Sequence, residues 1–231
     1  MSGTEKWAEG LTMNPIKVAA VADVHSPRFL NEFRAALTRC ETPDLFLFAG
    51  DMINRGKANE YPKVLDAVES QLGSGFPVVA CFGNEEPQDC HDEIRLSTKD
   101  RITILDEKGW TINISGVRIS IIGMSAANPQ SNSVNEMRTK FEARSHRLSG
   151  LLQSSSQYAD YVVLLMHFSP LKEVYSTEFS WWISKAIEKN PPSHIIHGHI
   201  HDSIKNEVKI GPTVIRNVAL PATGSITELN V

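Results

Sequence analysis

The chain has 231 residues, 41% of them hydrophobic, which is enough for one substantial core or at most two small ones. Its 23 basic and 27 acidic residues give a net charge of -4, so no broad basic surface is available for extended double-stranded nucleic acid or an anionic membrane. Three cysteines without C-x-x-C spacing, Cys40, Cys81 and Cys90, indicate reduced thiols rather than a disulfide framework.

The first 14 residues carry charge but no apolar segment of the kind that signal peptides contain. No other run reaches the roughly 18 uninterrupted apolar residues that a transmembrane helix requires. We therefore expect a cytoplasmic protein with no membrane attachment. Residues 1–14 would form a flexible extension, and residues 15–231 would form one domain.

Short, nearly continuous apolar runs recur along the chain, a pattern typical of strands that are covered on both faces. They occupy residues 16–22, 44–49, 76–82, 161–166 and 193–197.

Residues 27–40 and 58–72 lie between the first three runs and space their apolar side chains as helices do, with Pro27 suited to a first turn. These helices make β-α-β crossovers plausible.

The middle and the end of the chain show a different pattern. Residues 111–123 and 207–219 alternate apolar and polar side chains around a central glycine, which predicts two β-hairpins. Helices are expected at about 133–153 and 178–190, and residues 225–231 form a closing strand. Parallel-type strands combined with hairpins predict an α/β fold in which two mixed β-sheets pack together with helices outside.

A polar side chain that can bind a metal ion follows each of the five apolar runs. Open α/β sheets bind their ligands at the carboxyl ends of the strands, so these side chains should meet at one edge. The residues, in chain order, are Asp23, His25, Asp51, Asn84, His167, His199 and His201.

Each of these motifs has an ordinary interpretation when it is taken alone. Asp23 and His25 could be a turn residue and a surface histidine, Asp51 could cap a helix, and Asn84 could occupy a β-turn. His167 would be a strand-end histidine by default. The joint pattern is improbable by chance, because every motif occurs at the same kind of place in the chain.

The spacing within the motifs supports metal binding. Residues at i and i+2 of an extended segment project to the same side, so Asp23 with His25, and His199 with His201, can reach one cation. Imidazole suits iron, zinc, manganese or nickel. The two oxygens of Asp51 can bridge two cations about 3.5–4 Å apart.

The order D-x-H, G-D, G-N, H and G-H-x-H resembles the calcineurin-like metallophosphoesterase family from about residue 16 to residue 203, nearly the whole chain. Within that family it resembles the small single-domain prokaryotic predicted phosphoesterases. The resemblance implies a four-layer α/β/β/α sandwich with a dinuclear metal site, and it indicates a metal-dependent hydrolase of phosphate mono- or diesters.

The resemblance also implies a role for each residue of the site. The first metal would be bound by Asp23, His25 and His201, the second by Asn84, His167 and His199, and Asp51 would bridge them. The cofactors would be two divalent ions among manganese, iron, zinc and nickel, with manganese favoured. A bridging hydroxide would attack the phosphorus of a small phosphate ester or a nucleotide.

One segment departs from the family pattern. Many members carry G-N-H-[DE], in which the histidine assists the leaving group, whereas here Glu85 follows Asn84. Glu85 could act as an acid there only if its surroundings keep it protonated. His91 could replace the histidine, but we favour its interpretation as a solvated surface histidine.

A second segment points to substrate binding. Residues 50–56, GDMINRG, resemble the G-D-x-x-D-R-G segment of the serine/threonine phosphatases, with Asn54 in place of the acid. Arg55 could bind a phosphate through its planar guanidinium group, or it could be a surface arginine at a helix entry.

Two further functions stay open. A scaffold that binds partners through this fold without catalysis, as in the metallophosphoesterase-like subunit of retromer, could exploit the substitution at Glu85. A DNA-repair nuclease is disfavoured by the acidic net charge. A homodimer is compatible with the sequence.

Overall fold

The computed structural model describes residues 15–126, 134–171 and 181–231. The extension expected at residues 1–14 lies outside this part of the chain. The strand-ending motifs predicted from the sequence lie within it.

The first sheet is mixed. Strands β1 to β4 are parallel, and the C-terminal strand β11 pairs with β1 antiparallel, which gives the order β11-β1-β2-β3-β4. The strands are β1 (Lys17–Val21), β2 (Leu45–Ala49), β3 (Val78–Cys81), β4 (Thr103–Ile104) and β11 (Thr227–Asn230).

The second sheet is also mixed, with the order β5-β6-β7-β8-β10-β9. Its inner strands β6, β7, β8 and β10 are parallel, and the expected hairpins supply the antiparallel pairs β5–β6 and β9–β10. The strands are β5 (Lys108–Ile114), β6 (Val117–Met124), β7 (Tyr161–Met166), β8 (His194–His197), β9 (Glu207–Ile210) and β10 (Thr213–Asn217).

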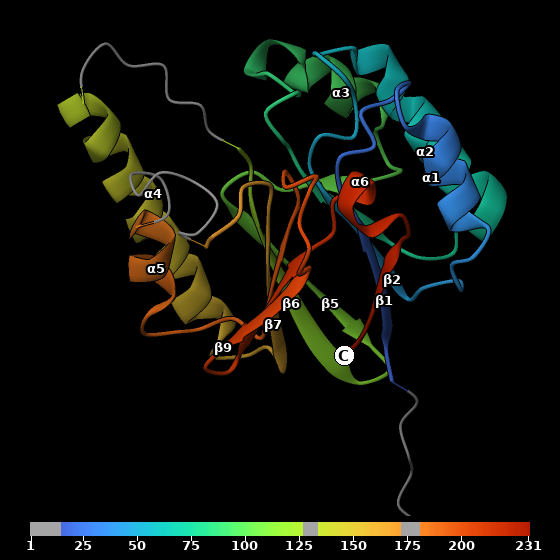
Figure 1. The fold of residues 1–231 in the computed structure, drawn as a ribbon. Coiled ribbons are helices and arrows are strands. Elements are labelled where there is room, and N and C mark those ends of the chain that lie inside the picture. The colour runs from blue at the N-terminus through green and yellow to red at the C-terminus, as the bar shows by residue number, and fades with distance from the viewer. Residues whose placement is uncertain (1–14, 127–133, 172–180) are drawn as a thin grey trace, which may run out of the picture.

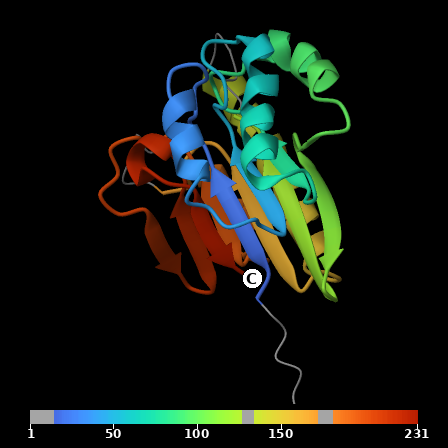
Figure 2. The same cartoon turned by 90° about the vertical axis from the view of Figure 1, so that its right-hand side faces the viewer.

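Helices cover the outer face of each sheet (Figure 1). Figure 2 shows α1 and α2 lying across the strands of the first sheet. The helices of this side are α1 (Leu30–Leu37), α2 (Tyr61–Leu72) and α3 (His91–Ser97), with 3-10 turns η1 (Ala58–Glu60) and η2 (Gln88–Cys90). The second sheet is covered by α4 (Val134–Ser155) and α5 (Trp181–Ile187), and the short α6 (Leu220–Thr223) follows β10.

Three hydrophobic clusters fill the spaces between four layers. Alternate residues of β2 point in opposite directions, so Phe46 and Phe48 pack against α1 and α2, whereas Leu45 and Leu47 pack against the second sheet. A third cluster joins the other face of the second sheet to α4 and α5, with Leu164 among its members. The predicted four-layer α/β/β/α sandwich is therefore confirmed.

The first helix differs from the prediction for residues 27–40. It begins at Leu30, and Pro27 lies before it rather than in its first turn. The residues before the helix instead run alongside the loop after β2. Ser26 forms a β-bridge with Ile53, and the carbonyl oxygen of Ser26 accepts the Asn54 N–H at 3.1 Å.

Strands of both sheets end at a common edge, where their loops are bonded to one another. The Asp23 N–H donates to Gly50 O at 3.1 Å, and the Gly198 N–H donates to His167 O at 3.0 Å. The His199 N–H then donates to Asp23 Oδ2 at 2.7 Å and connects the two sheets. This edge carries all the predicted metal-binding motifs.

In the described part of the chain, the helices are too short or too polar to cross a membrane.

A substitution at Gly123 of β6 should test how closely the chain segments pack near this edge. A Cβ at Gly123 would overlap the Cβ of Leu105 and lie 2.8 Å from its carbonyl oxygen, so Gly123→Ala should destabilise the fold by about 1–3 kcal/mol. Gly150→Ala is the control, because Gly150 is exposed in α4 and a Cβ added there would meet no atom within 4 Å. Urea unfolding should show the control stabilised by about 0.5–1 kcal/mol. Equal stability of both variants would contradict the packing described.

Candidate metal centre

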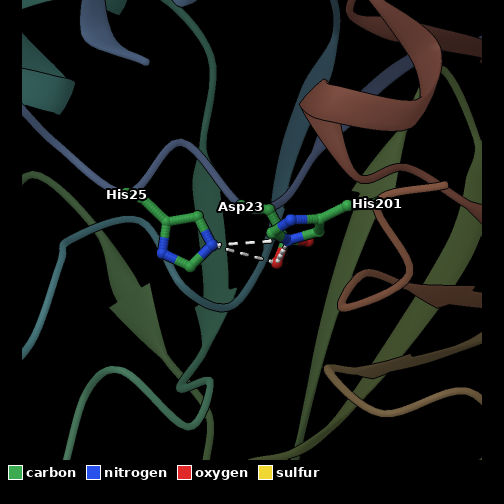
Figure 3. Close-up of side chains that lie close together, drawn as sticks. All are labelled: Asp23, His25 and His201. Carbon is green, nitrogen blue, oxygen red and sulfur yellow. Dashed lines mark hydrogen bonds and ion pairs between the residues drawn. The ribbon is translucent and has the colours of Figure 1, made fainter. Parts of the chain in front are cut away.

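The first of two groups of candidate ligands consists of Asp23, His25 and His201 (Figure 3). Their ligand atoms all lie within 4.8 Å of one another. His201 Nε2 lies 2.9 Å from Asp23 Oδ1, and the Nε2 atoms of His25 and His201 are 3.4 Å apart. Asp23 and His25 are buried, whereas His201 is exposed, so the group opens to solvent on one side.

The second group consists of Asp51, His167 and His199, again with ligand atoms within 4.8 Å of one another. His167 Nε2 lies 3.2 Å from Asp51 Oδ2 and 3.1 Å from His199 Nδ1. Asn84 joins this group, because its Oδ1 lies 3.1 Å from His167 Nε2.

One oxygen atom lies between the two groups. Asp51 Oδ2 is 3.2 Å from His167 Nε2 in the second group and 3.9 Å from His25 Nε2 in the first. The structure thus brings all seven sequence-predicted residues together and places the Asp51 carboxylate where the two groups meet.

The donor set fits metal ions better than it fits a set of hydrogen bonds. His167 Nε2 can donate at most one proton, yet Asp51 Oδ2, Asn84 Oδ1 and His199 Nδ1 all face it at 3.1–3.2 Å. A cation among these atoms would bind each of them through a lone pair. Imidazole nitrogens with carboxylate and amide oxygens suit divalent transition metals.

The backbone at the site adopts a conformation that is uncommon away from glycine. Four candidate ligands have positive φ angles: Asp23 (60°), His25 (44°), Asp51 (54°) and His199 (72°). Such conformations cost energy and concentrate at functional sites, where the surrounding contacts maintain them. Here the hydrogen bonds between loops provide those contacts.

The glycines of the motifs allow the loops to approach closely. A Cβ at Gly83 or Gly198 would overlap the carboxylate of Asp51 or Asp23, respectively. Gly50 has φ 85°, and its Cβ would lie 2.8 Å from His167 Nδ1. Each glycine is therefore required by the side chain of a neighbouring motif.

Histidines stabilise the negative charge of the buried Asp23. Burial alone would raise the pKa of this carboxyl, but hydrogen bonds with His201 and His25 outweigh it and lower the pKa well below its usual value. The same hydrogen bond to Asp23 raises the pKa of His201. The first group therefore contains an ionised carboxylate.

The two histidines of the second group differ in protonation. Burial lowers the pKa of His167, but the charge of Asp51 outweighs burial and raises the pKa to about 9. Burial and the charge of His167 lower the pKa of His199 to about 4. Binding a cation would remove the proton from His167, because metals bind neutral imidazole.

A backbone carbonyl orients His167. Its Nδ1 donates to Ala49 O at 3.0 Å, which directs Nε2 toward the second group and leaves Nε2 as the nitrogen that would bind a metal.

The structure adds one buried residue, Glu86, that sequence reasoning did not assign. Its carboxylate is 2% exposed and accepts the backbone N–H groups of Asp51 (3.0 Å), Met52 (2.7 Å), Ile53 (3.4 Å) and Gly83 (2.6 Å). It thereby binds the loops after β2 and β3 together. Burial and the charge of Asp51 raise the pKa of Glu86 to about 7. The acidic position of the G-N-H-[DE] pattern could have indicated this residue.

The remaining candidates lie around the second group. The Glu85 backbone N–H donates to Asp51 Oδ1 at 2.7 Å, and the Glu85 carboxylate accepts the backbone N–H of Arg55 at 2.8 Å. Arg55 is exposed. His91 is half-buried rather than the solvated surface histidine that we favoured from the sequence. It stacks on Phe82 with centroids 3.7 Å apart, and its Nε2 lies 2.8 Å from Glu86 O.

The fold and this arrangement of side chains define a two-sheet α/β protein with two candidate ligand sets for metal ions at the carboxyl edge. The family model for calcineurin-like phosphoesterases matches residues 16–203. The chain belongs to this family, whose members typically bind divalent metals. A comparison with curated protein sequences finds no significant match.

Solved structures of low sequence identity share the fold. TT1561 of Thermus thermophilus is 11% identical with a TM-score of 0.62, and the match covers 94% of this chain and 99% of TT1561. GAP50, the anchor in the inner membrane complex of Plasmodium, is 10% identical with a TM-score of 0.59 and coverages of 90% and 72%. The sulfate thiohydrolase SoxB of Thermus thermophilus is 12% identical with a TM-score of 0.60 and coverages of 94% and 53%.

Substitution of Glu86 should weaken the hydrogen bonds between the loops after β2 and β3 and destabilise the protein. Glu86→Gln replaces one acceptor oxygen by an NH2 group facing two backbone donors, so we expect a loss of about 1–3 kcal/mol in the free energy of unfolding. Glu188→Gln removes an exposed carboxylate and should change stability by less than about 0.5 kcal/mol. Urea unfolding measures both variants. A Glu86 variant as stable as its control would show that these hydrogen bonds are dispensable.

Proposed function

We propose that this protein is a hydrolase of phosphate mono- or diesters that depends on two divalent metal ions, with manganese the first to test. The observation that carries the proposal is the position of Asp51 Oδ2 between two groups of ligand atoms. The family, whose members include hydrolases and non-catalytic proteins, supports the same class of activity.

We assign Asp23, His25 and His201 to one metal, Asn84, His167 and His199 to the other, and Asp51 to both. Such a pair of metals activates water as a nucleophile and neutralises phosphate charge when it is bound. The chain's own contribution is geometric. Asp51 is oriented from one side by the Glu85 N–H, and Glu86 fixes the backbone of its loop.

Arg55 and Glu85 act together in this proposal. Arg55 binds the phosphate of the substrate, because its exposed guanidinium group forms no ion pair with any residue that the structure describes. The Glu85 carboxylate already accepts the backbone N–H of Arg55, so we assign Glu85 a role in positioning the Arg55 backbone rather than the role of an acid. His91 is not part of the proposed site, because its ring is stacked on Phe82 and bonded to Glu86 O.

The scaffold function is the weaker hypothesis. A scaffold has no need to retain seven ligand side chains in contact, although the fold neighbour GAP50 is described as an anchor. Purified protein that contains two metals but hydrolyses no phosphate ester would favour the scaffold.

Metal content and hydrolysis test the proposal directly. We expect about two manganese ions per chain by elemental analysis after loading and dialysis, since two groups of ligand atoms are present. The loaded protein should hydrolyse p-nitrophenyl phosphate or its bis ester, and chelation should abolish the activity. A protein that neither retains metal nor hydrolyses either ester would refute the proposal.

The substitution Asp51→Asn tests what the proposed bridging carboxylate contributes to metal binding and to the rate of hydrolysis. We expect loss of metal and a rate at least about 100-fold lower, because even residues that only orient metal ligands contribute 10–100-fold. Asp100→Asn is a matched control, since Asp100 is exposed, belongs to neither ligand group and has φ 65°, close to the 54° of Asp51. Elemental analysis and initial rates should show the control equal to the unmodified protein. Activity that persists in Asp51→Asn would argue against a bridging carboxylate.

A further inference from the structure

A second arginine, Arg28, lies beside the candidate metal centre on the loop after β1. Its Cζ lies 4.6 Å from the centroid of the Phe29 ring, and that ring meets the His25 ring at an interplanar angle of 65° with centroids 6.2 Å apart. The guanidinium group is therefore no further from the His25 ring than the sum of these two distances. Cation–π attraction favours its position over Phe29.

Arg28 and Arg55 leave neighbouring backbone segments. Ser26 pairs with Ile53, and each arginine follows its member of the pair by two residues. The Asn54 N–H donates to Ser26 O at 3.1 Å and fixes the two loops side by side. Both arginines thus stand at the edge of the sheet that carries the metal ligands.

Both positive charges are available to a ligand. Arg28 and Arg55 are exposed, and neither side chain forms an ion pair within residues 15–126, 134–171 and 181–231. Two carboxylates bonded to these loops have other partners. Glu60 accepts a hydrogen bond from Ser26 Oγ and pairs with Lys63, and Glu85 accepts the backbone N–H of Arg55.

We propose that Arg28 binds a second phosphate of the substrate, next to the phosphate at the metal centre, and that the substrate is an organic or nucleoside diphosphate. The inference rests on the hydrolase function proposed above. A monoester with a neutral leaving group would give Arg28 no anion to bind, whereas a diphosphate presents one beside the first phosphate. Guanidinium groups form paired, charge-assisted hydrogen bonds with phosphate oxygens.

Calorimetric titration of the full chain, loaded with manganese and dialysed, tests the inference with two probes. Imidodiphosphate, which has two linked phosphoryl groups and resists hydrolysis, should bind at least about tenfold more tightly than orthophosphate. Arg28→Met keeps an aliphatic chain over Phe29 but removes the charge. We expect it to lower the ratio of the two affinities by about tenfold.

Arg34→Met is the control, because Arg34 is an exposed arginine of α1 that also has no ion pair among the described residues. It should keep the original ratio of affinities. An unchanged ratio in Arg28→Met, or an equal fall in both variants, would overturn the role of Arg28. Such a result would not affect the proposed hydrolase function, provided that the protein retains metal and hydrolyses p-nitrophenyl phosphate. Absence of bound metal would overturn both.

Discussion

The carboxylate of Asp51 is the interaction on which the candidate site depends. Its Oδ1 accepts the Glu85 N–H, which leaves Oδ2 to face imidazoles that arrive from strands of different sheets. Such a buried carboxylate would be costly without partners. The contacts that stabilise the buried Asp51 carboxylate therefore also hold the loops of the two sheets next to one another.

The packing of the four layers determines where this carboxylate can meet its partners. The cluster between the sheets aligns β2 with β7, so Gly50 and His167, at the ends of these strands, come into contact. The cluster itself consists of apolar side chains, whereas the candidate metal ligands lie together at the carboxyl edge of the sheets. A core that fixes the register of its strands thus also fixes distances between side chains far apart in sequence.

Most of this arrangement could be predicted from the sequence. Apolar runs predict the buried strands, and the polar residue that follows each run predicts the edge of the sheet where the candidate ligands meet. The runs at 44–49 and 161–166 correspond to β2 and β7 within one residue at each end. Helix α3 was not predicted, since its seven residues are too few for a clear period. The predicted start at residue 27 was wrong, because α1 begins at Leu30. The residues before it belong to a loop that pairs at Ser26 with Ile53, and no local sequence pattern reveals that pairing.

Glu86 and Arg28 show why the surroundings of a site are harder to predict than the candidate ligands. Ligand residues carry a signal in their type and spacing, but Glu86 binds backbone N–H groups, which every residue of the distant loop possesses. Arg28 is placed by the ring of Phe29, and the sequence alone does not show that this ring faces His25. Family members that share the ligand motifs can therefore differ in these neighbouring residues, and such differences are a physical means of changing the substrate while the chemistry of the metal centre stays the same.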